Sequence, residues 1–234
     1  MSDLTAKKPR RSTDAAMLAR REEILETATE LFADHGFSDA VTQVLAERLQ
    51  VGKGTIYRHF PSKRDLFLAA ADRVMRKLQE QVNANIAGLD DGLERIERAT
   101  ATFLSFFAEH PSFVELLIQE RAYFKDRKRP TYFEHREINI ERWRQFYRDL
   151  IAQGRVRDMP VEQITNVVSN VLYGIMVTNF FNGQTTPSDI QAREILDVVF
   201  NGILTESERK HRGVAGRQRH NNGPAERDAA TVAQ

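Results

Sequence analysis

The spacing of apolar side chains constrains the fold of this chain more than any other feature. Apolar residues recur every three or four positions, as in "ILETATELFADHGF", where Leu25, Ala28, Leu31 and Phe32 fall on one face of a helix. We find no strand-like alternation of apolar and polar residues of any length. Because a spacing of three and four is the period of an amphipathic helix, the chain is predicted to be all-α.

Glycines, prolines and capping residues divide this periodic sequence into separate helices. Gly36 is placed as a left-handed C-cap of the first helix, and Pro61 ends the third. "SKRD", which starts at Ser62, has the pattern of a capping box and predicts the start of a long fourth helix. The predicted helices span residues 13–35, 42–49, 53–60, 62–87, 93–110, 112–125, 132–153, 160–181 and 186–208.

These helices group into two domains. Residues 13–61 hold three short helices, and residues 62–208 hold longer and more apolar ones, with 62–87 as the connecting helix. The two ends of the chain, residues 1–12 and 209–234, carry several Lys and Arg side chains and no apolar periodicity. We therefore expect a disordered basic arm at the start and a disordered basic tail at the end.

The composition excludes several classes of protein. The absence of cysteine rules out disulfides, Cys-ligated zinc and thiol catalysis. Hydrophobic residues make up 41% and charged residues 29% of the chain, as in soluble globular proteins. No apolar stretch approaches the roughly 20 residues that a membrane span needs, and no apolar signal core follows the basic start. We therefore expect a cytoplasmic protein.

Neither a metal site nor a catalytic site is predicted. No His-x-x-x-His pair occurs, and His135 stands among acidic residues on an ordinary charged helix face. We find no nucleophile with a base in its context, and no paired carboxylates outside exposed helix faces. The expectation is a protein without a metal, without a cofactor and without enzymatic activity.

Positive charge is concentrated in one short stretch, although the net charge of the 234 residues is only +1. Residues 50–64 carry Lys53, Arg58, Lys63 and Arg64 and no acidic residue. A local basic surface on a near-neutral protein favours directed contact with phosphates over bulk attraction.

The glycines of "VGKGTIYRHFPSKRDL", residues 51–66, raise the question of a phosphate-binding loop. A Walker loop needs Gly, four residues and then Gly-Lys-Ser/Thr, and a dinucleotide loop needs Gly-x-Gly-x-x-Gly after a strand. The stretch contains neither pattern and is preceded by a helix. A nucleotide-binding loop is therefore not predicted.

The same stretch meets the demands of a helix-turn-helix. Two short helices that cross at a steep angle need a small residue at the crossing, which Ala46 supplies, and an apolar wedge, which includes Leu45 and Ile56. The second helix also needs donors on its outer face, where early residues approach base edges. The residues that remain for this face are Lys53, Thr55, Tyr57, Arg58 and His59.

"ILETATELFADHGF" followed by "LAERLQVGKGTIYRHFPSKRDL" resembles the tetracycline-repressor (TetR) family of bacterial transcription regulators. The resemblance covers about residues 13–80, and the remainder matches in outline only. It implies that residues 13–61 form a DNA-binding domain and that the recognition helix contacts DNA through Lys53, Gly54, Thr55 and Tyr57. It also implies that Thr42, His59 and Lys63 contact backbone phosphates, and Arg58 completes the candidate DNA-binding residues.

The sequence departs from the family pattern at two positions. Gln50 stands where the turn usually has glycine, so the backbone there is either left-handed or set differently. Val41 stands where the cap of the second helix is commonly threonine, which leaves Asp39 or Thr42 to cap that helix.

The second domain is rich in aromatic residues. For most of them burial in the core is the simpler interpretation, but an aromatic-rich helical domain beside this DNA-binding module resembles the effector pocket of the family. The candidate ligand-binding residues are Phe103, Phe107, Trp143, Phe146, Tyr147, Tyr173 and Met176.

The segment "ITNVVSNVLYGIMVTNFF", residues 164–181, is apolar nearly all round, so that it must be covered on both sides. It is either a central core helix or a helix with one face against a partner chain. Together with the stripe on the last helix it resembles one half of a four-helix dimer interface. The candidate interface residues are Val168, Leu172, Ile175, Ile195, Val199 and Ile203.

These features lead to one hypothesis and one alternative. The hypothesis is a homodimeric repressor that binds a pseudo-palindromic operator in double-stranded DNA, associates with the nucleoid when bound, and is released by a small-molecule effector that displaces helix 62–87. The alternative is a helical ligand-binding or protein-interaction module with a vestigial helix-turn-helix, motivated by Gln50 and the near-neutral net charge. No membrane partner is expected.

Overall fold

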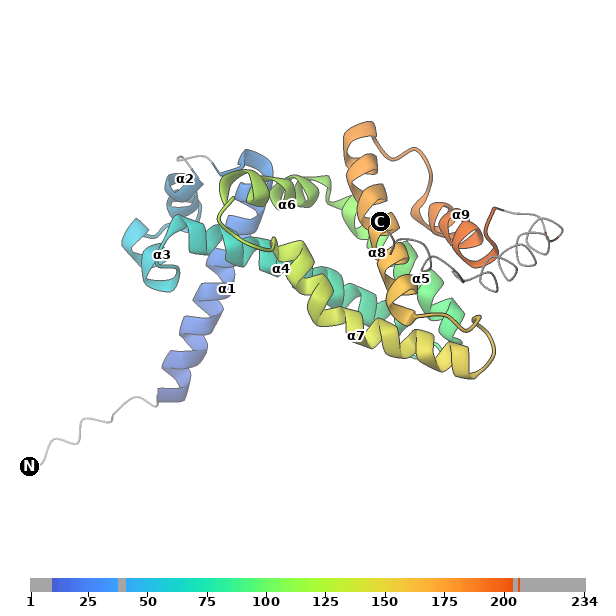
Figure 1. The fold of residues 1–234 in the computed structure, drawn as a ribbon. Helices are drawn as coiled ribbons and strands as arrows, with labels where there is room; N and C mark the ends of the chain where they lie inside the picture. Colours follow the sequence, from blue (N-terminus) through green and yellow to red (C-terminus); the bar gives the residue numbers. More distant parts are fainter. Residues whose placement is uncertain (1–9, 38–40, 204–205, 207–234) are drawn as a thin grey trace, which may run out of the picture. The chain divides into compact units, whose positions relative to one another are not determined.

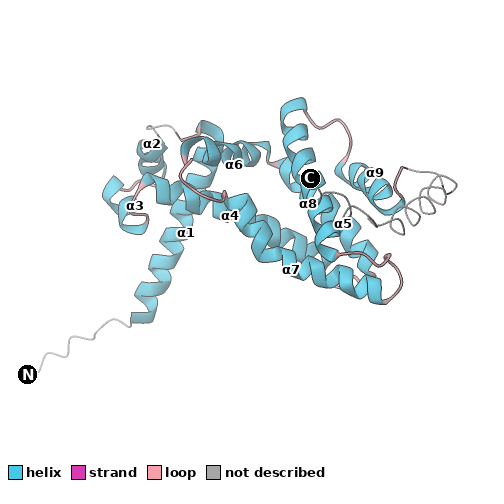
Figure 2. Cartoon of the chain, viewed as in Figure 1, coloured by secondary structure: helices cyan, strands magenta, loops and turns pink. Residues whose placement is uncertain are grey.

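The computed structural model describes residues 10–37, 41–203 and 206. Within them the chain forms helices and no strand, so the predicted all-α class is confirmed (Figures 1 and 2). The chain divides into two compact units, Met1–Arg193 and Glu194–Gln234. The helices are α1 (Arg10–His35), α2 (Val41–Arg48), α3 (Lys53–His59), α4 (Lys63–Ile86), α5 (Gly92–Glu109), α6 (Pro111–Tyr123), α7 (Thr131–Ala152), α8 (Val161–Asn182) and α9 (Ser188–Asn201).

The observed helix bounds differ from the predicted ones mainly at the two ends of the chain. Helix α1 begins at Arg10, three residues before its predicted start, so it includes part of the predicted arm. Helix α9 ends at Asn201, because Gly202 adopts a φ of 72° and its N–H bonds to the carbonyl of Val198 at 2.9 Å. The remaining arm, residues 1–9, and the predicted tail lie outside the described residues.

The predicted stop of α1 and start of α4 are both confirmed. Gly36 has a φ of 65°, and its N–H donates to the carbonyl of Phe32 at 2.9 Å. The Ser62 hydroxyl accepts from the N–H of Asp65 at 3.0 Å and donates to the Asp65 carboxylate at 2.7 Å. Ser62 therefore caps α4, and this cap fixes the direction in which the helix leaves α3.

Helix α4 packs against α1 near its start and against α5 and α7 further along. Its apolar side towards α1 is fully buried, including Phe67 and Val74. The nearly buried guanidinium of Arg73 donates to Glu22 at 2.8 Å and to Glu26 at 2.9 Å, both on α1. Since both carboxylates hold one buried cation, α1 and α4 are joined by charge as well as by apolar packing.

An aromatic cluster joins the end of α1 to α4 and α6. The ring of Phe37 lies 5.4 Å from that of Phe67 and 5.2 Å from those of Tyr123 and Phe124. The Phe37 N–H also donates to the side-chain oxygen of Gln119 on α6 at 3.1 Å. The module of short helices is thus fixed to α6 as well as to α4.

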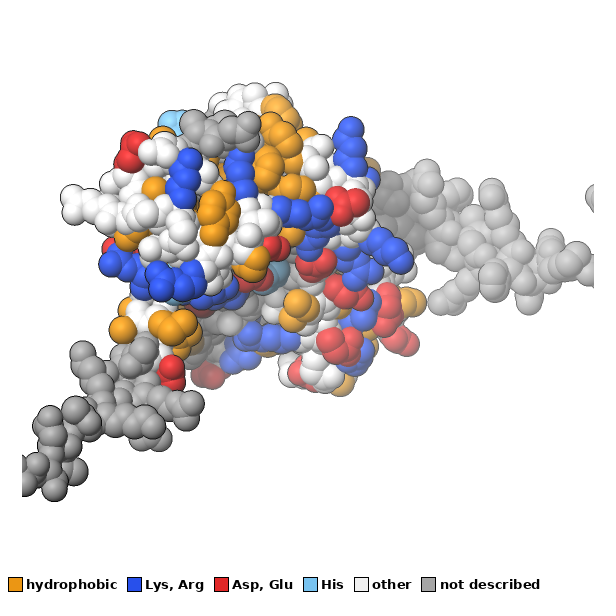
Figure 3. Space-filling view, turned by 90° about the vertical axis from the view of Figure 1, so that its left-hand side faces the viewer, with side chains coloured by type: hydrophobic (Ala, Val, Ile, Leu, Met, Phe, Trp, Pro, Cys, Tyr) orange, Lys and Arg blue, Asp and Glu red, His pale blue; other side chains and the backbone are white. Residues whose placement is uncertain are grey.

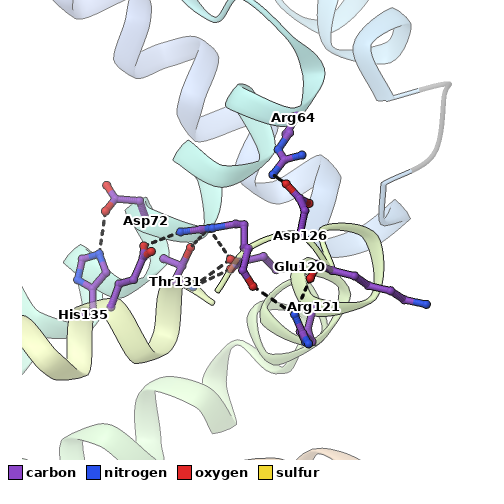
Figure 4. A network of polar contacts seen from close by, with 10 residues as sticks. Arg64, Asp72, Glu120, Arg121, Asp126, Thr131 and His135 are labelled. Carbon is purple, nitrogen blue, oxygen red and sulfur yellow. Dashed lines mark hydrogen bonds and ion pairs between the residues drawn. The ribbon is translucent and has the colours of Figure 1, made fainter. Parts of the chain in front are cut away.

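Helix α7 begins at a carboxylate that comes from a different helix. Pro130 provides no side-chain cap, and the first N–H of α7, that of Thr131, donates to Glu120 of α6 at 2.9 Å. Glu120 is 1% exposed and also accepts from Arg127 at 2.5 Å. Figure 4 shows Glu120 and Thr131 at the centre of this network, with the Arg64–Asp126 ion pair beside it.

Helix α8 corrects the expectation that no segment is apolar enough to span a membrane. By length and composition alone it is a candidate, with 22 residues and a mean hydropathy of 1.3 in its most apolar window. However, its side chains Asn166 and Asn170 accept hydrogen bonds from Arg136 of α7. A guanidinium bound to this helix would be costly inside a bilayer.

Candidate functional site

The sequence left two alternatives for the backbone at Gln50, in the turn between α2 and α3. The structure has the left-handed one. Gln50 has a φ of 51° and is the one residue other than glycine with a positive φ in the described part of the chain. The N–H of Val51 donates to the carbonyl of Ala46 at 3.0 Å and closes the turn. Leu45 and Ile56 are fully buried on either side of it, so the wedge of the helix-turn-helix is packed.

The outer side of α3 exposes basic and aromatic side chains. Lys53, Gly54 and Arg58 are exposed, and Tyr57 is 39% exposed. Thr55, which accepts a long hydrogen bond of 3.4 Å from Arg58, is half-buried, as is His59. In Figure 3, which faces the side of the molecule that lies to the left in Figure 1, blue Lys and Arg side chains are interspersed with uncharged ones.

Gly54 has no structural reason within the chain to be glycine. A Cβ atom built at this position would meet nothing within 4 Å, and Gly54 is not among the glycines with positive φ. A missing side chain on an exposed helix face lets another molecule approach the backbone closely. Gly54 therefore leaves room on this face of α3 for a binding partner.

Of the candidate phosphate contacts, Lys63 is engaged within the protein and Thr42 is buried. The Lys63 ammonium donates to the carbonyl of Phe37 at 3.3 Å and lies 4.0 Å from the centre of the Phe37 ring. Thr42 is only 5% exposed, whereas its neighbour Gln43 on α2 is exposed and donates to Glu47 at 2.5 Å. Of these residues, Gln43 was not singled out from the sequence, because an isolated glutamine carries no distinctive pattern. Asp39, the other candidate cap of α2, lies outside the described residues.

A cavity of about 160 Å³ lies between α4, α5, α7 and α8. Three of the seven candidate ligand-binding residues line it, namely Phe103, Trp143 and Tyr147. The other four do not line the cavity. Three of them pack against residues that do: Phe107 against Phe103, Phe146 against Trp143, and Tyr173 against Tyr132. Met176 is buried in the core.

The cavity wall also carries residues that the sequence did not single out. The Nε2 atom of His135 shares a hydrogen bond of 2.7 Å with the carboxylate of Asp72 on α4. The guanidinium of Arg136 donates to the side-chain oxygens of Asn166 and Asn170 on α8 at 3.2 and 3.1 Å. Both belong to a segment that looks like an ordinary charged helix face, so that only the fold reveals that they point to the cavity.

Two buried tyrosines line the cavity as well. Burial raises the pKa of the Tyr147 hydroxyl to about 12, and burial likewise raises that of Tyr132. Both side chains therefore remain neutral hydrogen-bond donors at any physiological pH.

The candidate interface residues occupy different environments. Val168 and Leu172 line the cavity, Ile175, Ile195 and Val199 are half-buried, and Ile203 is 85% exposed. The outward side of α8 instead presents Val167, which is 50% exposed, and Phe181, which is 68% exposed.

No group of three or more His, Asp or Glu side chains that could hold a metal ion is found in the described ranges. The candidate site thus consists of an exposed basic face on α3 and a mainly apolar cavity, and α4 connects the two.

Comparison with known proteins adds a family match. The sequence model of the family described as "Bacterial regulatory proteins, tetR family" matches residues 24–70, from α1 into α4. The chain is similar to the uncharacterized HTH-type transcriptional regulator YerO of Bacillus subtilis, with 25% identity over 76% of the chain and 61% of YerO. It is also similar to the HTH-type transcriptional repressor AcnR of Corynebacterium glutamicum, with 28% identity over 76% of the chain and 89% of AcnR.

The match therefore spans less than two thirds of YerO and most of AcnR. Among solved structures, the transcriptional regulator FadR from Bacillus subtilis in complex with stearoyl-CoA has the same fold, with a TM-score of 0.60 and 17% identity. That similarity covers 78% of this chain and 99% of FadR.

Proposed function

Because the chain belongs to the TetR family of bacterial regulatory proteins, we propose that it is a transcription regulator that binds an operator as a homodimer and is released by a small effector. It acts in the cytoplasm and associates with the nucleoid when bound. The relative AcnR is a repressor, which supports repression as the mode of action.

The observation that carries this proposal is the outer side of α3. Lys53, Tyr57 and Arg58 are exposed there, and no acidic residue occurs from position 50 to 64. In the bound state the first turn of α3 approaches base edges in the major groove, while His59 and Lys63 lie near phosphates. Two copies place their α3 helices about 34 Å apart, one turn of DNA.

The outward side of α8 supports the homodimer. No charged residue occurs between Glu162 and Asp189, and Val167 and Phe181 are exposed on this uncharged part of α8. An exposed apolar helix face on one chain is stabilised when a second copy covers it.

The contacts of α4 support effector control. His135, on the cavity wall, is bound to Asp72 of α4, and Arg73, the next residue, is bound to α1. A ligand that shifts α7 relative to α4 therefore acts on a helix that carries the DNA-binding module. The ligand shifts the equilibrium by its difference in affinity for the two states. FadR, which shares the fold, holds stearoyl-CoA.

The test is operator binding measured by fluorescence anisotropy. Labelled duplexes from the DNA beside the gene, with and without their inverted repeat, are titrated at several salt concentrations. The double variant Tyr57→Phe/Lys63→Ala is expected to lose specific binding while its helical circular dichroism stays unchanged. Arg148→Gln, on α7 away from α3, is the control and should bind like the wild type.

Equal binding to the inverted repeat and to scrambled DNA at every salt concentration would reject the proposal. It would favour the alternative of a helical ligand-binding or protein-interaction module with a vestigial helix-turn-helix. The left-handed Gln50 argues against that alternative, because the turn keeps its form without glycine.

A further inference from the structure

The charges on the cavity wall are unbalanced. The residues that line it include His135 and Arg136 but neither aspartate nor glutamate. His135 is bound to Asp72, whereas Arg136 is bound only to the neutral side chains of Asn166 and Asn170 among the described residues. A guanidinium has five N–H donors, and these two bonds leave three of them for a ligand.

A second pocket, of about 320 Å³, shares Arg136 and Ile140 with the first. Its wall adds Lys128, Arg129 and Arg144. Arg129 lies 3.8 Å from Glu137 and Arg144 lies 3.3 Å from Glu141, which leaves Lys128 and Arg136 without a carboxylate partner among the described residues. These two cations give the end of the cavity where Arg136 lies a positive charge that attracts an anion.

Tyr132 supplies a second donor at the same end. It lies one helical turn before Arg136, on the same face of α7. It is buried, and no hydrogen bond of its hydroxyl is found within the described residues. The hydroxyl of such a largely buried side chain can donate to an acceptor on a ligand bound in the cavity.

The remainder of the wall is mainly apolar and carries no charge. Its polar residues are the neutral Gln79, Thr100, Asn139, Thr165 and Ser169. From Arg136 to Tyr147 the cavity follows α7 for about 16 Å, by the rise of an α-helix. Along this length Leu78, Phe103 and Trp143 present apolar surface. The wall thus suits a slender apolar group with its polar end at Arg136.

We propose that the effector is a slender apolar molecule with one anionic group, of the carboxylate type, which Arg136 and Tyr132 bind while the apolar part extends towards Tyr147. This inference rests on the proposed function, since it names the chemical class of the effector. Arg136 and Tyr132 are ligand-binding residues in this assignment.

The test uses Trp143, the only tryptophan of the chain, as a fluorescent reporter in the cavity wall. The full-length protein is titrated with decanoate, decanol and decylamine below their critical micelle concentrations. These probes have the same chain length and differ in charge. Decanoate is expected to bind about ten- to a hundred-fold more tightly than decanol, as for a charge-assisted hydrogen bond, and decylamine more weakly than decanol.

Variants then assign the preference to residues. Arg136→Gln is expected to reduce decanoate affinity to that of decanol without changing decanol affinity. Tyr132→Phe should weaken decanoate binding several-fold. The matched controls are Arg148→Gln, an exposed arginine on the same helix, and Tyr173→Phe, whose ring contacts Tyr132 but does not line the cavity. Both controls should bind decanoate like the wild type.

Equal affinities of the wild type for decanoate and decanol, the absence of binding by any probe, or a preference retained in Arg136→Gln would overturn the inference. If Arg136→Gln does not fold, the three probes on the wild type and the Tyr132→Phe variant decide the question. Operator binding is measured separately without ligand. Its failure counts against the proposed function, whereas a missing charge preference beside normal operator binding counts against this inference alone.

Discussion

Gln50 shows how one residue can carry local strain in a functional turn. A left-handed conformation costs a non-glycine residue about 1–2 kcal/mol, and Gln50 adopts it with its side chain exposed. The burial of Leu45 and Ile56 on either side of the turn offsets this cost.

We expect Gln50→Gly to raise the free energy of unfolding by about 0.5–1 kcal/mol, because glycine removes the steric cost but increases the entropy of the unfolded chain. Urea denaturation measures this change. Operator affinity should stay within two-fold, since the backbone is already in the required form. A loss of stability would mean that the Gln50 side chain makes a stabilising contact.

A substitution at Gly54 should change DNA binding without lowering stability. Alanine meets no other atom there, so Gly54→Ala should leave the thermal midpoint unchanged or raise it by an amount worth up to about 1 kcal/mol. Operator affinity should fall by at least ten-fold, because the added methyl group stands between α3 and the DNA. Unchanged affinity in anisotropy titrations would show that the backbone at Gly54 does not approach DNA closely.

At the scale of helices, the sequence predicts the start or end of a helix where neighbouring residues determine it. Gly36, Pro61 and Ser62 act on their immediate neighbours, and the structure has the predicted stop and cap there. The start of α7 depends instead on Glu120, which belongs to the preceding helix. A local pattern cannot reveal a cap that comes from another helix.

Replacement of the buried Glu120 carboxylate should lower the stability of the protein markedly. Glu120→Gln removes the buried one of the two carboxylates that pair with Arg127 and leaves only Glu134, which is 45% exposed. The loss of a charged, buried acceptor should lower the free energy of unfolding by about 2 kcal/mol. Glu137→Gln is the control, since Glu137 is exposed and 3.8 Å from Arg129, and it should change stability by less than about 0.5 kcal/mol. Equal effects of the two changes in chemical denaturation would contradict this account.

The candidate site shows the same limit of sequence-based prediction. The basic face of α3 follows from a contiguous motif, and the sequence placed its residues together. The cavity takes its wall from two pairs of consecutive helices, α4 with α5 and α7 with α8. In the sequence, its residues His135 and Arg136 cannot be distinguished from a solvated helix face. Likewise, Val168 and Leu172 have the spacing of an interface but line the cavity.

At the scale of the whole molecule, we expect α8, which has no charged residue after Glu162, to form the interface of the proposed dimer. Val167→Glu places a carboxylate on its exposed side, and it should convert a dimer into a protomer of 26.9 kDa in light scattering coupled to size exclusion. Ile138→Glu, at an exposed apolar residue of α7, is the control and should remain dimeric. A dimer that persists in Val167→Glu would place the interface elsewhere.

The ion pairs between the buried Arg73 and the half-exposed carboxylates of Glu22 and Glu26 on α1 have a mechanical consequence. We expect α1 and α4 to move as one rigid body because of these ion pairs. Helix α4 alone, with 24 residues, is about 36 Å long. If α4 tilts by about five degrees about one end, its other end moves by about 3 Å, which is close to the spacing of one base pair along DNA. Because these ion pairs oppose sliding of the two helices past each other, the proposed mechanism would convert a small angular change beside the cavity into a displacement of α3 by about one base-pair step.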